Sequence, residues 1–462
     1  MLKLRNTLSR KIEVFKPLKE KTVNLFVCGP TVYDHAHLGH AKSYIQFDVI
    51  ARFLRHQGYQ VFYLQNITDI DDKIIKRAQE TKRSPKEVAE AFTKSYLEDM
   101  QSLNATSVNR YAPATNYMPE IVSQIQRMLK QGLAYELSDG VYFNISKFKG
   151  YGKLSHQDLK QLNQHRIEPN QKKKNAGDFS LWKSAKPGEP FWDSPFGQGR
   201  PGWHIEDTAI TEKEFGQQYD IHGGGIDLIF PHHEAEICQM ESLSGKPLVK
   251  YWLHNGFLQV NNEKMSKSLG NFITIKDALS RWGSMAVRFF FATNHYREQI
   301  NFTEEAVLSA KNGYERLNNL HFNLTEKIKT AKDGKKSSKL LKKVSLHYQQ
   351  FIKEMEKDFN TPAAAAHLFE LARELNSYLN DSPEKKTLQE GLTSLQELAG
   401  ILGLQFTQAE AIPAKIRELT KQRETARKNK DWAQSDTLRK EIEAAGYSID
   451  DTIEGTRIRK KK

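Results

Sequence analysis

The chain has 462 residues, enough for about three domains of ordinary size. Its mean hydropathy is −0.65, and no apolar run approaches the roughly 20 residues of a membrane-spanning helix, which excludes an integral membrane protein. Residues 1–16 do not resemble a secretory leader, so we expect a cytoplasmic chain. Two cysteines, Cys28 and Cys238, exclude a disulfide framework. The formal charge of +13 favours a polyanionic partner, above all nucleic acid, although a merely soluble basic enzyme stays equally open.

The first part of the chain predicts an α/β fold. A short apolar run at residues 25–28 is stopped by Gly29 and indicates a buried strand. Apolar residues then recur at helical spacing from Leu38 until Gly58. A second buried strand follows at residues 61–64, before the polar turn 68–72 and another helix. Strand, helix and strand in this order predict a parallel sheet.

The middle of the chain interrupts this pattern. Residues from about 112 to 200 hold a lysine run, several Gly and Pro, and Phe191-Trp192, so we predict an insertion with long loops. The strand pattern resumes at residues 219–222. After about Asn301 the chain becomes mostly helical, with a helix start at residues 358–362, where a polar cap precedes proline. Ile412-Pro413 opens a last, strongly charged segment.

A His-x-Gly-His segment, residues 37–40, lies between the first strand and the first helix. A helix N-terminus offers unpaired N–H groups and the positive end of the helix dipole. Gly39 allows a nucleotide to approach the backbone, and His37 and His40 can donate hydrogen bonds to phosphate oxygens. On these residues alone, a pair of structural surface histidines is the more common explanation.

A second motif, the lysine loop, is Lys264-Met265-Ser266-Lys267-Ser268. Two lysines around a serine can pair with a triphosphate whose charge moves during adenylyl transfer. Alone, this loop is better explained as a solvated basic loop.

Together and in this order, the two motifs resemble those of class I aminoacyl-tRNA synthetases. The surrounding segments narrow the resemblance to the cysteinyl-tRNA synthetase family: residues 28–34, 66–73, 199–206, 222–225 and 230–234. It implies a split Rossmann-like catalytic domain at 1–310 with a connective module inserted at about 112–200. A helical-bundle tRNA-binding domain at 311–405 and a small, basic anticodon-recognition domain at 406–462 would follow.

The resemblance also implies roles for individual residues and a reaction. Cysteine and ATP, with Mg²⁺, would form cysteinyl-adenylate, and the ester would pass to the 3′ end of tRNA-Cys on a monomeric enzyme. The implied groups are His37, His40, Lys264 and Lys267 for catalysis; Gly39, Met265, Ser266, Ser268 and Lys267 for ATP; Thr31, Thr68, Trp203 and Asp227 for the amino acid; and Trp432 and Arg457 for tRNA. For Thr68 and Asp227, a helix-capping or turn role is an equal alternative.

The resemblance implies one Zn²⁺ per chain, held by Cys28, position 207, His232 and Glu236. Position 207 departs from the family, which has cysteine where this chain has Asp207. Either Asp207 is an oxygen ligand of unchanged charge, or the site is weakened or empty; we favour the first because the other three ligand types are intact. Pro231 is expected to begin a helix that puts His232 and Glu236 on one face.

Zinc suits this substrate because it binds a thiolate selectively, whereas a shape-based pocket rejects a near-isostere such as serine only ~10²-fold. Two rival functions are kept. A cysteine ligase acting on a small amino sugar would share the catalytic half but lack a full anticodon-binding tail. A non-catalytic RNA-binding relative would have decayed ATP motifs, and here both motifs are intact.

Overall fold

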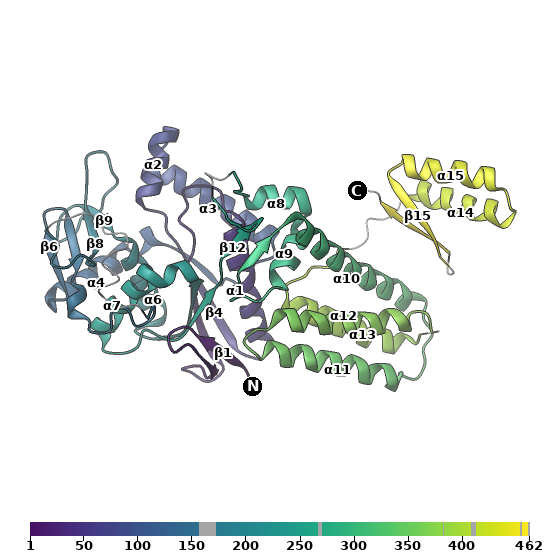
Figure 1. The fold of residues 1–462 in the computed structure, drawn as a ribbon, viewed down its shortest axis with the longest axis horizontal. Helices are drawn as coiled ribbons and strands as arrows, with labels where there is room; N and C mark the ends of the chain where they lie inside the picture. Colours follow the sequence, from purple (N-terminus) through teal and green to yellow (C-terminus); the bar gives the residue numbers. More distant parts are fainter. Residues whose placement is uncertain (157–171, 267–269, 382, 408–412, 453–454, 461–462) are drawn as a thin grey trace. The chain divides into compact units, whose positions relative to one another are not determined.

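The computed structural model describes residues 1–156, 172–266, 270–381, 383–407, 413–452 and 455–460. The chain forms two compact units (Figure 1): residues 1–320 with 324–405, and residues 321–323 with 406–462. No helix among these described residues is long and apolar enough to cross a membrane.

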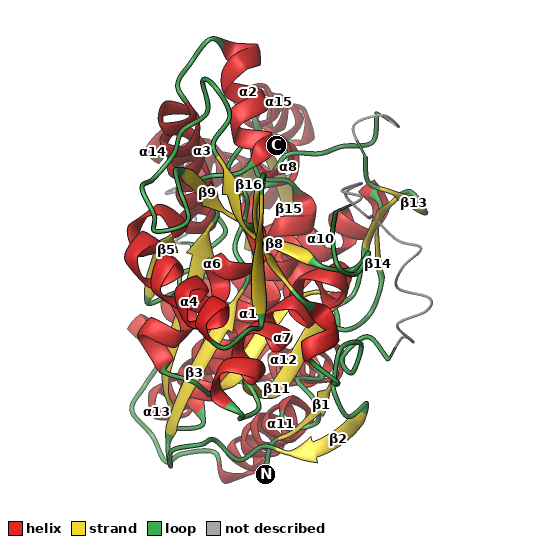
Figure 2. Cartoon of the chain, turned by 90° about the vertical axis from the view of Figure 1, so that its left-hand side faces the viewer, coloured by secondary structure: helices red, strands yellow, loops and turns green. Residues whose placement is uncertain are grey.

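A five-stranded sheet forms the centre of the first unit, in the order β11-β10-β3-β4-β5. All its pairings are parallel, as the sequence predicts. Its strands, several of which carry yellow arrows in Figure 2, are β3 (Thr22–Val27), β4 (Gln60–Ile67), β5 (Arg110–Pro113), β10 (Tyr219–Gly225) and β11 (Val249–Asn255). Most residues of β3, β4, β10 and β11 are buried, because helices cover both faces of a parallel sheet.

Helix α1 (Leu38–His56) follows β3. Its apolar positions pack on the sheet, and it stops before Gly58, whose φ of +84° ends the helical path. The helices α2 (Asp72–Thr81) and α3 (Pro85–Ser102) lie between β4 and β5. Asp71 caps α2, and Ser84 with Glu87 forms a capping box on α3.

The segment between β5 and β10 is more ordered than the predicted long loops. It contains helix α4 (Met118–Lys130) and a four-stranded antiparallel sheet of β6 (Ala134–Leu137), β7 (Gly140–Phe143), β8 (Phe179–Ser184) and β9 (Gly199–Pro201). Ala112 itself belongs to β5 of the central sheet. Trp182 and Phe143 are fully buried in the core of this module, where they pack with α4 and with helix α6 (Trp203–Phe215). The scattered apolar residues of this stretch therefore form a hydrophobic core. The sequence signals this core only weakly, because such short strands show little period-2 alternation.

The remaining small strands and helices of the first unit lie before β3 and between β10 and residue 304 in the sequence. An N-terminal hairpin pairs β1 (Lys3–Asn6) with β2 (Lys11–Val14). After β11, β12 (Leu258–Val260) pairs with β13 (Glu263–Lys264) and β14 (Ile300–Phe302). Helices α8 (Ile275–Trp282) and α9 (Ser284–Ala292) separate these strands, and α7 (Glu234–Ser244) precedes β11.

Four helices complete this unit: α10 (Glu304–Thr330), α11 (Ser338–Met355), α12 (Thr361–Tyr378) and α13 (Lys385–Ile401). Asn360 caps α12, and Pro362 stands at its second position rather than the expected first. Buried Arg288 of α9 joins the bundle to the α/β layers. Its guanidinium pairs with Asp48 of α1 and donates to the carbonyl oxygens of Leu402 at 2.8 Å and Leu103 at 2.8 Å.

Two glycines of α13 differ in the space around them, so we expect opposite effects when each is replaced by alanine. A Cβ at Gly391 would overlap Cδ2 of fully buried Leu375 on α12, whereas a Cβ at Gly400 would meet nothing within 4 Å. We expect Gly391→Ala to destabilise the fold by roughly 1 kcal/mol or more, because overpacking outweighs the helix propensity gained. Gly400→Ala, the matched control, should be neutral or stabilising by up to ~1 kcal/mol. Thermal unfolding midpoints check this, and equal shifts in the two variants would contradict it.

The second unit contains α14 (Ala414–Lys428), α15 (Trp432–Ala444) and a hairpin of β15 (Tyr447–Thr452) and β16 (Gly455–Lys460). Ile416, Ile442 and Ile449 form its small core. Buried Arg423 makes a bidentate pair with Asp451, at 2.7 and 2.8 Å. Because this core is small, such a fork-shaped pair adds geometric definition to the hairpin.

Candidate functional site

The His-x-Gly-His segment begins α1 at the carboxyl end of the parallel strands, where α/β sheets bind ligands. His37 is the N-cap: its Nδ1 accepts the Gly39 N–H at 3.1 Å, and His40 Nδ1 accepts the His37 N–H at 3.2 Å. The two rings stack with centroids 3.9 Å apart. Burial, and then the neighbouring His37, hold the pKa of His40 well below its usual value. His40 is therefore neutral at pH 7 and offers a hydrogen bond rather than a charge.

The chain just after the lysine loop lies directly beside this segment. The Leu38 N–H donates to the Ile273 carbonyl oxygen at 3.1 Å, and the Ile275 N–H donates to the Ala36 oxygen at 2.9 Å. Phe272 meets the His37 ring edge-on at 5.3 Å. These contacts bring together two motifs that are about 230 residues apart in the sequence, as their predicted joint role requires.

Asn271 holds the base of the lysine loop. Its side chain accepts the Ser266 N–H at 2.8 Å and donates to the Lys264 carbonyl oxygen at 3.2 Å. Lys264 is exposed on β13, and Cε of Met265 lies 3.7 Å from where a Cβ on Gly39 would stand. Lys267 and Ser268 lie outside the described residues.

Lys42, which the sequence did not single out, links α1 to the strand that leads into the lysine loop. Its Nζ is buried and donates to the oxygens of Gly256 at 2.7 Å, Gln46 at 3.1 Å and Tyr296 at 3.3 Å. Burial lowers its pKa to about 7. A lysine after a helix start is too common on solvated faces for sequence alone to have marked it.

Four predicted metal ligands meet in one buried cluster. Tyr44 links it to the His-x-Gly-His segment, because its hydroxyl donates to the Cys28 carbonyl oxygen at 3.3 Å and its ring stacks with His40 at 6.1 Å between centroids. Cys28, Asp207, His232 and Glu236 each offer a ligand atom, and these atoms lie within 4.8 Å of one another; we call them the first ligand set. Asp207 Oδ2 is 3.5 Å from Cys28 Sγ and 3.1 Å from His232 Nε2. His232 Nε2 is 3.0 Å from Glu236 Oε1. Asp207 is thus placed where the family has its second cysteine.

The chemistry of the first ligand set fits a divalent cation. Within the part of the chain that the structure describes, Asp207 Oδ1 and Glu236 Oε1 are buried without an aligned hydrogen-bond donor. Burial raises the pKa of the Cys28 thiol, and the nearby charges of Asp207 and Glu236 raise it further. Burial also raises the pKa of Glu236 to about 7. Acidic groups crowded away from water are stabilised by a bound cation, which takes the place of their protons.

The helix expected to carry both His232 and Glu236 begins later than predicted and carries only Glu236. Helix α7 starts at Glu234, and Pro231 belongs to the irregular turn η4 (Ile229–His233), in which Phe230 has extended backbone angles. Proline therefore marks the kink before the helix rather than its first residue. His232 and Glu236 nevertheless face each other, as their four-residue spacing predicts.

Three of the candidate amino-acid contacts lie beside the cluster. Thr68 Oγ1 donates to buried Glu206 Oε2 at 3.1 Å, and the backbone of Thr31 pairs with Thr68. Trp203 stacks on His232 with centroids 4.1 Å apart and remains 38% exposed, so one side of its ring is open to a ligand.

Asp227 occupies the short turn η3 (Ile226–Leu228), and its Oδ1 lies against Gly225. Its side chain is exposed, as a group that meets a substrate amine must be. Neither Thr68 nor Asp227 caps a helix, since Asp71 caps α2 and Gly225 precedes η3. The capping half of the alternative is therefore wrong for these two residues, whereas Asp227 does lie in a short turn, so the turn role stays open beside the substrate contact.

Sequence reasoning missed a layer of buried histidines beside Cys28. His222 Nε2 and His233 Nε2 lie 3.4 and 3.1 Å from Cys28 Sγ, and His254 Nε2 lies 2.8 Å from His233 Nδ1. A side chain at Gly224 would press on the His233 ring, which explains a glycine there. His222 and His233 belong to the segments 222–225 and 230–234, which carry the family resemblance together with the segment that contains Cys28. Their membership of those segments was the available signal.

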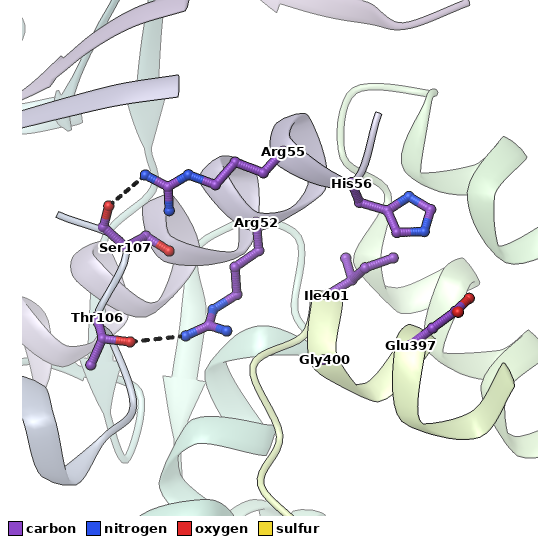
Figure 3. A pocket seen from close by; sticks show the side chains of 8 residues that line it. All are labelled: Arg52, Arg55, His56, Thr106, Ser107, Glu397, Gly400 and Ile401. Atoms are coloured by element: carbon purple, nitrogen blue, oxygen red, sulfur yellow. Dashed lines mark hydrogen bonds between the residues drawn. The ribbon is translucent and has the colours of Figure 1, made fainter. Parts of the chain in front are cut away.

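A hollow of about 350 Å³ lies at the C-terminal end of α1, opposite to the end that His37 caps (Figure 3). Since α1 has 19 residues, this end is about 28 Å from His37. Arg52 donates to Thr106 Oγ1 at 3.2 Å, and Arg55 donates to the Ser107 oxygen at 2.8 Å. No candidate catalytic residue lines this hollow.

In the second unit, Trp432 begins α15 and is 57% exposed, with the Arg427 guanidinium 5.8 Å from its ring centroid. The Arg457 backbone belongs to β16, opposite Asp450; its side chain lies outside the description. An exposed tryptophan beside a guanidinium is the type of group on which RNA bases stack.

Family models match nearly the whole chain. Residues 14–312 match the catalytic domain of class I (C) tRNA synthetases, residues 350–407 a DALR domain, and residues 409–459 the anticodon-binding domain of cysteinyl-tRNA ligase. The chain belongs to the cysteinyl-tRNA synthetase family. The predicted resemblance and the α/β fold class with its helical second part are thereby confirmed.

Relatives named cysteine–tRNA ligase span the same length. That of Thermococcus onnurineus is 44% identical and that of Methanococcus maripaludis 45%, with coverage of at least 98% of both chains in each case. Among solved structures, a Mycobacterium tuberculosis methionyl-tRNA synthetase covers 82% of this chain and 89% of its own at a TM-score of 0.60. An Agrobacterium radiobacter leucyl-tRNA synthetase covers 84% and 86% at 0.62. At 18% and 12% identity, these two show the fold alone.

Proposed function

We propose that this chain activates L-cysteine with ATP and Mg²⁺ and transfers it to the 3′ end of tRNA-Cys. The observation that carries this proposal is the contact between the His-x-Gly-His segment and the chain around the lysine loop, close to a buried thiol, carboxylate and imidazole cluster. Such a site can hold a triphosphate and a sulfur-bearing amino acid next to each other. Two free thiols suit a reducing compartment such as the cytoplasm, where we propose that the chain works as a monomer.

In the first step, the cysteine carboxylate attacks the α-phosphorus of ATP and pyrophosphate leaves. His37 and His40 donate to phosphate oxygens, while Lys264 and Lys267 stabilise the charge that develops on the leaving group. Gly39, Met265, Ser266 and Ser268 shape the ATP site. No enzyme nucleophile is needed, because the amino acid itself attacks.

The amino acid would be held on three sides. Thr31, Thr68 and Asp227 would orient its α-amino group and backbone, and Trp203 would cover its side chain. The first ligand set would hold a zinc ion, which supplies a Lewis acid that prefers the substrate thiolate to a serine hydroxyl. Trp203 also shields His232 by stacking on it, which fixes the imidazole of that ligand.

The helical bundle and the second unit would bind the tRNA stem and anticodon, with Trp432 and Arg457 in contact with RNA. The match to an anticodon-binding domain over residues 409–459 supports this role. It also counts against the amino-sugar ligase, which we expected to lack such a tail.

Amino-acid-dependent ATP–pyrophosphate exchange, run with each of the twenty amino acids, tests the proposed activity. We expect exchange with cysteine, and a rate with serine that is lower by more than the ~10²-fold achievable by shape alone. Exchange with none of the twenty would leave only the RNA-binding alternative, and a serine rate close to that of cysteine would contradict the thiolate-based selection.

Asp207→Cys tests the metal proposal. We expect one zinc per chain after mild purification, with zinc lost to a chelator about 10-fold faster from the native protein than from the variant, because thiolate is the softer ligand. Both should prefer cysteine to serine. Ser244→Cys, which adds a thiol at the far end of α7, is the control and should change nothing. Zinc near zero in native protein that still selects cysteine would mean that selection depends on another group.

A further inference from the structure

A second set of four potential metal ligands overlaps the first. Cys28 and Glu236 belong to both sets, and His222 and His233 replace Asp207 and His232. We call these four residues the second ligand set. Its ligand atoms also lie within 4.8 Å of one another, and all four residues are buried.

Two ligand-atom distances in the second ligand set are close to those of tetrahedral zinc coordination. Zinc with bonds of 2.0–2.3 Å keeps neighbouring ligand atoms about 3.3–3.8 Å apart. Cys28 Sγ lies 3.1 Å from His233 Nε2 and 3.4 Å from His222 Nε2. An ion could therefore enter with side-chain shifts of a few tenths of an ångström.

Both histidines are oriented as metal ligands are in proteins, with one ring nitrogen in a hydrogen bond and the other toward the site. His222 Nδ1 lies 2.6 Å from the Tyr219 hydroxyl, and His233 Nδ1 lies 2.8 Å from His254 Nε2. His254 Nδ1 in turn lies 2.8 Å from Thr7 Oγ1. In the tautomer in which His233 Nδ1 donates to His254 Nε2 and His254 Nδ1 donates to Thr7 Oγ1, the lone pair of His233 Nε2 faces Cys28.

Glu236 can serve either set because its two oxygens point in different directions. Its Oε1 lies 3.0 Å from His232 Nε2 in the first set, and its Oε2 lies 3.4 Å from the His222 ring at Nδ1, the nitrogen that also meets Tyr219. One Glu236 oxygen lies within 4.8 Å of the other ligand atoms in each set. Cys28 and Glu236 could therefore stay bound to an ion in either position.

Asp207 alters the balance between the two sets. The first set offers zinc one sulfur, one imidazole and two carboxylates, whereas the second set offers one sulfur, two imidazoles and one carboxylate. Imidazole nitrogen suits zinc at least as well as a carboxylate oxygen does, so with Asp207 the first set has no clear advantage in ligand type. A cysteine at position 207 would add a strong soft ligand to the first set alone.

We propose that zinc in this chain has two overlapping binding positions, one in each ligand set, with Asp207 making the histidine position accessible. This inference rests on the proposed function only in assuming that the cluster holds zinc.

Zinc affinity in four full-length proteins tests the coupling: the native chain, Asp207→Cys, His233→Gln and the double variant, each titrated against a chromogenic chelator. With Asp207 present, His233→Gln should weaken zinc binding at least ~10-fold, the scale of losing a ligand or its support. In the Asp207→Cys background, the same change should have less than a third of that effect. Equal effects in the two backgrounds would overturn the proposal.

X-ray absorption on the zinc-loaded native chain decides the matter even if His233→Gln does not fold. We expect one sulfur and more than one imidazole around zinc in the native chain, but two sulfurs and one imidazole in Asp207→Cys. A single imidazole in the native chain would overturn the two positions while leaving the synthetase function intact. A native chain that activates cysteine without binding zinc would overturn the metal role itself.

Discussion

Replacing Lys267 with alanine should lower the rate of cysteine-dependent ATP–pyrophosphate exchange at least ~10²-fold, the scale of losing one preorganised electrostatic contact. The residues on either side of it support this expectation. Asn271 fixes the base of the lysine loop, and the chain that follows is hydrogen-bonded to the start of α1. We therefore expect a lysine in this loop to approach the leaving pyrophosphate as its charge develops.

Lys246→Ala is the matched control for this variant. Lys246 is exposed in the turn before β11, at the amino ends of the parallel strands, whereas α1 begins at their carboxyl ends. Its loss should therefore leave exchange unchanged. Exchange that is unchanged in Lys267→Ala as well would show that the loop does not follow the charge of the triphosphate, and the assignment of the lysine loop would fail.

Ending the chain after Thr407 should spare cysteine activation and reduce tRNA aminoacylation about 10³-fold, the lower end of the usual gap between specific and non-specific nucleic-acid binding. The truncation removes α14, α15 and the hairpin, which have their own small core, so the catalytic unit keeps its packing. Pyrophosphate exchange and tRNA charging, measured on the same preparation, separate the two activities.

A point variant refines this result. Trp432→Ala should weaken charging by loss of one stacked base, worth about 1–3 kcal/mol. Ile12→Ala, at a similarly exposed residue of the N-terminal hairpin, should not affect charging. Charging that survives the truncation would show that residues 408–462 are not the anticodon module.

Much of the fold was predictable because its signals are local. The strand at residues 25–28, the helix from Leu38 to the Gly58 stop and the cap at Asn360 each depend on residues within a few turns of one another. The connective module was less predictable, because strands of only four residues are too short to show a clear alternation of buried and exposed positions. Its antiparallel sheet is defined mainly by long-range packing around Trp182.

The sequence by itself determined the family, the two ATP motifs and four candidate ligands, because matching motifs require only residue types at fixed spacings. It also exposed the change at position 207. Only the tertiary structure decided that His222 and His233 flank Cys28, that Glu236 faces two ligand sets, and that Lys42 ties α1 to Gly256. The contacts of Cys28 and of Lys42 join residues that are nearly 200 or more positions apart. Those of Glu236 depend on the direction in which each of its two oxygens points. They follow from strand order and side-chain direction in the folded sheet, which spacing along a chain does not encode.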